Sequence, residues 1–129
     1  TTEIYTLSLH DALPISDRKD RMQRFNANNP YLEYETFKAV EGYKVGYEKL
    51  LSQGFDTDHN WIDPILKTPL TKGEVGCFLS HWHLWNKCIE KNEPIIVLED
   101  DAILTEKFDV EEISKLEYDF VYLGWKEMY

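Results

Sequence analysis

Three consecutive acids, Glu99, Asp100 and Asp101, follow the short apolar run at residues 95–98. Carboxylates at the end of an apolar strand repel one another, and taking each of them out of water is costly. A divalent cation compensates this charge, and a set of oxygen ligands favours Mg²⁺ or Mn²⁺. Side chains alternate along an extended backbone, so we expect Glu99 and Asp101 on one side and Asp100 on the other. The alternative is that the acids cap the next helix or simply end the strand in solvent.

Basic side chains gather only near the start of an otherwise acidic chain, at Arg18, Lys19, Arg21 and Arg24. At a helix start these side chains could contact a diphosphate, although a solvated helix face explains them equally well. The chain has 14 Lys and Arg against 24 Asp and Glu, a net charge of −10. Such a field repels phosphate backbones, so nucleic acid is not an expected partner.

Two histidines, His81 and His83, lie on one predicted helix. Positions two apart differ by about 200° around a helix, so the pair cannot bind one ion. We expect His83 on the polar face with Ser80, Lys87 and Lys91. His81 falls on the buried side, as a core histidine or as a residue that lines a site.

A helix from Lys72 must position these histidines. Thr71 can cap it and Glu74 can complete a capping box, while Asn92 and Pro94 end it. Apolar residues recur along this helix and predict burial on two sides. The main stripe is Val75, Phe78, Trp82, Trp85 and Ile89, and the arc is extended by Cys77, His81, Leu84 and Cys88.

Short apolar runs predict the strands. Residues 95–98 are apolar without alternation, as in a strand covered on both faces of a parallel sheet. Residues 34–40 and 120–123 are the other predicted strands. Helices are expected over 17–28, with Asp17 as its cap, and over 45–53, and a loop or short helix over 105–116. The pattern indicates an α/β fold, in which ligands bind at the carboxyl ends of the strands.

The 129 residues suit one domain. The sequence shows no transmembrane run and no signal peptide, so a cytoplasmic setting is expected. Cys77 and Cys88 lie about 16 Å apart along the helix, too far for a disulfide, and both are expected as buried thiols. Residues 1–16 show no clear period, and LSLHDALPIS resembles translated library-adapter sequence. We interpret 1–16 as a foreign leader and 17–129 as the functional portion.

Four motifs together resemble glycosyltransferase family 25: DRKDRMQRF at 17–25, FKAVEG at 37–42, LTKGEVGCFLSHWHLW at 70–85 and IIVLEDDAIL at 95–104. The resemblance covers about residues 17–125. That family includes bacterial lipooligosaccharide galactosyltransferases and animal collagen galactosyltransferases. The resemblance implies a truncated GT-A-like (Rossmann-like) fold with a mostly parallel sheet and flanking helices. It also implies sugar transfer, usually from UDP-galactose, to a saccharide acceptor in lipooligosaccharide or other cell-surface glycan synthesis, with Mn²⁺ or a similar cation.

Site residues follow from the resemblance position by position. Asp100 and Asp101 correspond to the motif for the metal and diphosphate, and His81 lies in the LSH block as a structural or site-lining residue, with Ser80 to cap or orient it. The donor nucleotide sugar is expected to contact Arg18, Arg21, Glu41, Gly42 and Glu99. The family's apolar first strand is replaced here by the leader, and its acceptor-binding segments and general base lie beyond the motifs present, so the chain is expected to bind donor and to be inactive alone.

Two other functions fit parts of the pattern. A binding-only relative would keep nucleotide affinity without transferring sugar. A receiver-type signalling domain also places acids at strand ends, but its acidic pair belongs on the first strand, whereas Asp100 and Asp101 come late in the chain. A longer protein containing this portion could associate with the membrane surface without spanning it.

Overall fold

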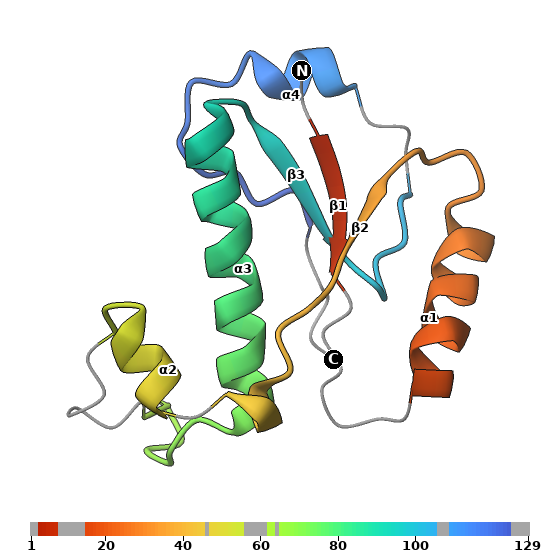
Figure 1. Ribbon diagram of the computed structural model, residues 1–129. Coiled ribbons are helices and arrows are strands. Elements are labelled where there is room, and N and C mark those ends of the chain that lie inside the picture. The colour runs from red at the N-terminus through yellow and green to blue at the C-terminus, as the bar shows by residue number, and fades with distance from the viewer. Residues whose placement is uncertain are drawn as a thin grey trace.

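The described part of the chain forms a sheet of three parallel strands in the order β2-β1-β3. The computed structural model describes residues 3–7, 15–45, 47–55, 62–63, 65–105 and 109–124 (Figure 1). The strands are β1 (Glu3–Leu7), β2 (Glu35–Phe37) and β3 (Ile95–Glu99). In the register, Leu7 at the end of β1 is opposite both Phe37 and Glu99. All three strands therefore end at the same edge of the sheet.

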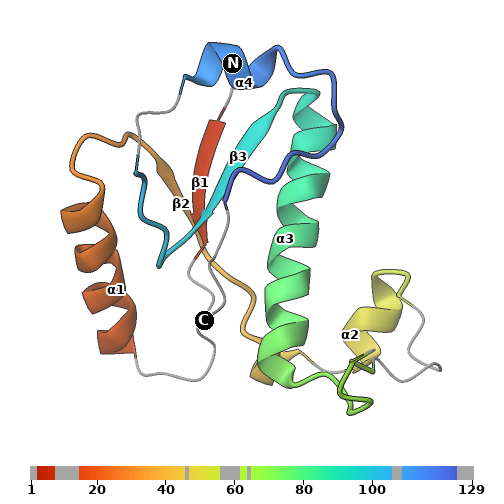
Figure 2. The same cartoon turned by 180° about the vertical axis from the view of Figure 1, so that it is seen from behind.

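Helices cover both faces of this sheet (Figures 1 and 2). Helix α1 (Ile15–Asn28) contributes Phe25, which packs with Ile96 and Leu98 of β3. Helix α3 (Lys72–Lys91) contributes Leu84, which packs with the other face through Phe37, Ile95 and Val97. The predicted α/β class, the parallel sheet and the coverage of residues 95–98 on both faces are confirmed, whereas the GT-A-like assignment stays a prediction.

Strand β1 corrects the expectation that the family's first strand is missing. Glu3–Leu7 is the central strand and pairs with β2 on one side and β3 on the other (Figure 1). A central strand gains backbone hydrogen bonds from two neighbours, so it does not need a regular apolar period to form. The origin of residues 1–16 stays a prediction, and residues 8–14 lie outside the described part.

The ends of α3 are as predicted. Thr71 and Glu74 form the capping box, with the Glu74 N–H donating to the Thr71 hydroxyl at 3.2 Å. Asn92 ends the helix in the left-handed conformation, with φ of 53°. At such ends, the hydroxyl or N–H group of the capping residue forms hydrogen bonds with backbone groups that have no partner inside the helix.

The buried face of α3 differs from the predicted stripe. Its buried residues are Gly76, Leu79, Ser80 and Leu84, whereas Trp85 is 41% exposed and Ile89 74% exposed. Phe78 and Trp82 pack instead on Phe55, which follows the short helix α2 (Tyr47–Ser52), with ring centroids 5.6 and 4.9 Å apart. Side chains on two sides of α3 are thus buried only where another segment of the chain packs against the helix.

Smaller differences concern element ends. Helix α1 begins at Ile15, before Asp17, so Asp17 is inside the helix and is not its cap. The strand predicted at 34–40 is reduced to Glu35–Phe37, and the 3₁₀ helix η1 (Gly42–Lys44) follows it. The short helix α4 (Val110–Ser114) confirms the prediction for 105–116, and Asp109 caps it.

The strand predicted at 120–123 is wrong. These residues have no regular structure, and Phe120 and Tyr122 are 70% and 78% exposed. An apolar run becomes a buried strand only where a neighbouring strand pairs with it and helices cover it. The three-stranded sheet formed by the described residues includes no pairing of this kind for 120–123.

Cys77 and Cys88 are not joined in a disulfide, as predicted, but both are half-buried and not fully buried. Among the helices of the described residues, none combines the length and the apolar character needed to cross a bilayer.

Candidate functional site

The connections between strands place a site at the carboxyl ends of β1 and β3. Helix α1 connects β1 to β2 across one face, and α3 precedes β3 on the opposite face. The chain passes from β1 to β2 on one side of β1 and later continues to β3 on the other side. In open α/β sheets, ligands bind where the strand order reverses in this way. Glu99 ends β3 beside Leu7, and Asp100 and Asp101 follow directly.

The backbone turns immediately after Glu99. The Ala102 N–H donates to the Glu99 carbonyl at 3.0 Å, which puts Asp100 and Asp101 at the centre of a tight turn. Glu99 and Asp100 lie on opposite sides as expected: Glu99 contacts α3 and Asp100 contacts α1. Asp101 lies in the turn after the strand has ended, where the alternation of an extended backbone no longer applies, so the prediction that it shares the side of Glu99 stays a prediction.

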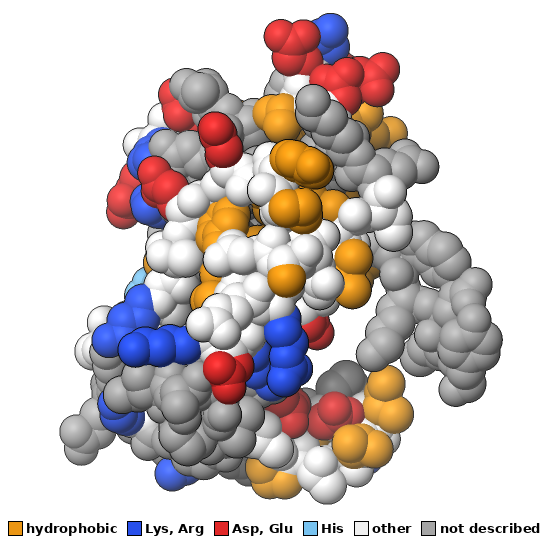
Figure 3. All heavy atoms as spheres, turned by 90° about the vertical axis from the view of Figure 1, so that its right-hand side faces the viewer, with side chains coloured by type: hydrophobic (Ala, Val, Ile, Leu, Met, Phe, Trp, Pro, Cys, Tyr) orange, Lys and Arg blue, Asp and Glu red, His pale blue; other side chains and the backbone are white. Residues whose placement is uncertain are grey.

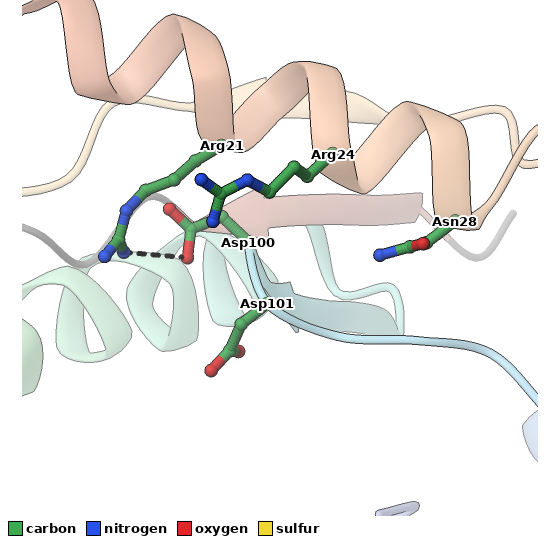
Figure 4. Close-up of a pocket in the computed structure, with 5 residues that line it drawn as sticks. All are labelled: Arg21, Arg24, Asn28, Asp100 and Asp101. Atoms are coloured by element: carbon green, nitrogen blue, oxygen red, sulfur yellow. Dashed lines mark ion pairs between the residues drawn. The ribbon is translucent and has the colours of Figure 1, made fainter.

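Asp100 and Asp101 line a pocket together with Arg21, Arg24 and Asn28 of α1 (Figure 4). Asp100 is buried, and its Oδ1 lies 3.6 Å from Nη1 of Arg21. In Figure 4 the guanidinium groups of Arg21 and Arg24 extend from α1 toward Asp100, while the Asp101 carboxylate points away from the helix. Acidic and basic side chains from two segments distant in sequence are thus brought to one place.

The size and charge of the pocket define what it can bind. Its volume is about 220 Å³, below the range of about 300–1,000 Å³ for pockets that enclose a drug-sized ligand. Two carboxylates can bind a hard divalent cation, and two guanidinium groups can donate hydrogen bonds to phosphate oxygens. Basic and acidic side chains also lie close together in the lower part of the surface on the α1 side (Figure 3). The pocket thus offers groups that can bind a cation and groups that can bind an anion, in a volume that suits a small ligand.

A buried amide holds the turn against α1. The Asn29 side chain donates to the carbonyls of Phe25 and Ala102 at 2.9 and 3.0 Å, and its Oδ1 accepts from the Leu104 N–H at 2.9 Å. Asn29 directly follows the helix, and Ala102 directly follows Asp101. Asn29 was not predicted as a site residue, although an Asn after a helix is a known local signal for side-chain to backbone bonding.

On the other side of β3, His81 of α3 faces Glu99. Its Nε2 lies 3.6 Å from Oε1 of Glu99, and Cys77 lies one helical turn before His81. The ligand atoms of all three residues are within 4.8 Å of one another. His83 is outside this group and its ring packs against Trp82, with centroids 5.0 Å apart, so the two histidines are separated as predicted. A site-lining role for His81 stays a prediction.

Ser80 neither lies on the polar face nor orients His81, which corrects two expectations. It is fully buried, and its hydroxyl donates to the Gly76 carbonyl and accepts from the Val40 N–H, both at 2.8 Å. A small hydroxyl can satisfy both its own helix and a passing chain where a larger side chain would not fit. Ser80 therefore fastens α3 to the segment that follows β2.

Among the described residues, the predicted donor residues Glu41 and Gly42 do not line the pocket. Glu41 precedes η1 and forms an ion pair with Lys44. Gly42 is buried against the start of α3, where an added Cβ would lie 1.7 Å from the Lys72 carbonyl oxygen. Arg18 lies in α1, and its side chain is outside the described part. Donor contacts by these residues stay predictions.

Comparison with known protein families identifies the family of this chain. The family described as "Glycosyltransferase family 25 (LPS biosynthesis protein)" matches the chain over residues 1–129. The chain belongs to glycosyltransferase family 25. The resemblance drawn from the four motifs is thereby confirmed, and the match extends over the first residues as well.

Relatives of this family 25 chain include galactosyltransferases. Procollagen galactosyltransferase 1-B of Xenopus laevis is 35% identical over 122 residues, which cover 87% of this chain and 20% of that protein. The "Glycosyltransferase 25 family member" of Aedes aegypti is 33% identical over 87% of this chain and 20% of its own length. The chain thus spans about a fifth of the length of these relatives. No solved structure matches it.

In this family 25 chain, the metal-ligand atoms that the pocket offers can be compared with those that the expected cation prefers. Asp100 and Asp101 offer only carboxylate oxygens, the ligand type that Mg²⁺ and Mn²⁺ prefer. The nearby guanidinium groups are positively charged, so they can bind a negatively charged phosphate. The residues present therefore fit a hard divalent cation.

Proposed function

We propose that this chain is the donor-binding portion of a glycosyltransferase that transfers galactose from UDP-galactose to a saccharide acceptor. The single observation that supports this most strongly is the pocket in which Arg21 and Asp100 meet at 3.6 Å. The relatives named as galactosyltransferases favour galactose as the sugar. The family description, which refers to LPS biosynthesis, leaves a lipooligosaccharide or other cell-surface glycan as the proposed acceptor.

In this proposal Asp100 and Asp101 hold the cation, Mn²⁺ or Mg²⁺, which when bound neutralises the charge that develops on the diphosphate leaving group. Arg21 and Arg24 donate hydrogen bonds to phosphate oxygens and orient the diphosphate toward the acids. Burial of Asp100 keeps its carboxylate fixed in position before the ligand arrives, which strengthens an electrostatic site.

Calorimetric titration of the purified chain with UDP-galactose tests this proposal. We expect binding in the presence of Mn²⁺ and loss of binding when a chelator replaces it. UDP-glucose and GDP-mannose, each with Mn²⁺, serve as comparison ligands for the sugar and for the base. Absence of binding by a chain shown by circular dichroism to be folded would contradict the donor-site assignment.

The same preparation separates an enzyme from a binding-only relative. Release of UDP from UDP-galactose in the presence of a saccharide acceptor is the mark of transfer, whereas binding without release is the mark of the alternative. The cytoplasmic setting and any contact of a longer protein with the membrane surface stay predictions, and fractionation of cells that express the full-length gene tests both.

A further inference from the structure

We infer a second metal site, formed by Cys77, His81 and Glu99, that binds a thiophilic divalent cation such as Zn²⁺. It lies on the α3 side of the β3 end, whereas the pocket of Arg21 and Asp100 lies on the α1 side. The inference is independent of the proposed nucleotide site. It rests on ligand type, on distances and on the elements that hold the three side chains.

The distances suit a small tetrahedral ion. Bonds of about 2.0–2.3 Å at tetrahedral angles place neighbouring ligand atoms about 3.3–3.8 Å apart. Nε2 of His81 and Oε1 of Glu99 are 3.6 Å apart, within that range and too long for a hydrogen bond. The Cys77 sulfur completes a set in which no two ligand atoms are more than 4.8 Å apart. Small side-chain rotations would therefore close the site around an ion.

The backbone presents these ligands on regular elements. Cys77 and His81 are four residues apart on α3, a spacing that puts both side chains on the same face. The helix is fixed beside them, because the buried Ser80 hydroxyl bonds to both the Gly76 carbonyl and the Val40 N–H. Glu99 is the last residue of β3 and is paired with Leu7. Sites built on helices and strands hold their geometry better than sites on loops.

Ligand chemistry separates this site from the first. A thiolate, an imidazole and a carboxylate are the mixed ligands of Zn²⁺, whereas Mg²⁺ and Mn²⁺ prefer sets made of oxygen. Cys77 and His81 are half-buried and the Glu99 side chain is 48% exposed. A cation can therefore enter, and three protein ligands leave a fourth position for water or another small ligand.

Binding of Zn²⁺ to the whole chain, measured by calorimetry, tests this inference. We expect one site per chain in the wild type and at least about a tenfold loss of affinity in Cys77→Ser and in His81→Ala. Cys88→Ser and His83→Ala are the matched controls, because they change the same residue types on the same helix outside the cluster. These controls are expected to bind as the wild type does. Wild-type affinity in both ligand variants, or an equal loss in the controls, would overturn the site.

Two further readouts keep the test decisive if a variant folds poorly. Co²⁺ bound by the wild type should show the absorption of a tetrahedral ion together with a thiolate charge-transfer band, and Cys77→Ser should lack that band. Zn²⁺ at about 100 times its dissociation constant should raise the melting midpoint of the wild type by about 5–10 °C. The absence of a thiolate band in the wild type would overturn the inference.

One variant distinguishes this site from the proposed nucleotide site. Asp101→Asn changes the exposed acid of the pocket and leaves Cys77, His81 and Glu99 in place. It should keep its full Zn²⁺ affinity, whether or not it binds UDP-galactose. Loss of Zn²⁺ binding in this variant would mean that the ion occupies the pocket instead of the cluster, and would overturn the second site alone.

Discussion

Arg21 of α1 and Asp100 of the turn after β3 form an ion pair, with Nη1 and Oδ1 separated by 3.6 Å. The side chain of Asp100 is 3% exposed and that of Arg21 25% exposed. The pair joins α1 to the turn that follows β3. It thereby places Asp100, which is proposed to bind the metal, beside Arg21, which is proposed to bind phosphate.

Replacement of Arg21 by Ala should lower both stability and donor affinity. A buried carboxylate that loses a cationic neighbour is destabilised, and because Arg21 is partly exposed we expect a loss of about 1–2 kcal/mol. Urea denaturation followed by tryptophan fluorescence measures the change. Lys19→Ala is the matched control, because Lys19 is an exposed base of the same helix. A free energy of unfolding for Arg21→Ala equal to that of the control would show that the pair contributes nothing.

Asn29 should be essential for the position of the acidic turn. Asn29→Ala removes one hydrogen bond to the Phe25 carbonyl of α1 and two to the segment after Asp101, and should cost about 2–3 kcal/mol, because buried backbone groups lose their partner. Asn28→Ala, one residue earlier, changes a side chain that lines the pocket and is exposed, and should leave stability nearly unchanged. Thermal unfolding of the two variants compares them, and similar midpoints would contradict this role for Asn29.

Two glycines near the start of α3 should respond in opposite ways to Ala. In Gly42→Ala the new Cβ would lie 1.7 Å from the Lys72 carbonyl oxygen, so η1 and α3 must move apart. We expect a loss of at least about 2 kcal/mol, as for overpacking of a core. Gly73→Ala meets no atom closer than 3.9 Å and should gain up to about 1 kcal/mol from helix propensity. Equal stabilities in guanidinium denaturation would refute the close contact at Gly42.

Local signals in the sequence were sufficient to predict α3 and β3. The capping box of Thr71 and Glu74, the stop at Asn92 and the apolar run at 95–98 act over a few residues, so they are legible without knowledge of the fold. The acidic residues at the strand end could also be placed at a sheet edge, because the carboxyl end of a parallel strand is a general site of ligand binding.

Features that depend on distant neighbours were not predictable. The central position of β1 comes from pairing with β2 and β3, and exposure of Phe120 and Tyr122 comes from the lack of such pairing. The tight turn closed by the Ala102 N–H directly after Glu99 was also not legible in the sequence. Likewise, Glu99 meets His81 and Cys77 because α3 packs beside β3 on one face of the sheet.

The most direct test of the central claim is the Mn²⁺-dependent affinity of Asp101→Asn for UDP. Asp101 lines the pocket and is exposed, so the substitution removes a proposed metal ligand without disturbing the Arg21–Asp100 pair. Asp119→Asn, at an exposed aspartate outside the pocket, is the control. We predict at least about a tenfold loss of affinity in Asp101→Asn when Mn²⁺ is present, since removing a metal ligand weakens the site, and no loss in the control. Equal affinity of the two variants for UDP with Mn²⁺ would contradict a metal-assisted diphosphate site at the end of β3.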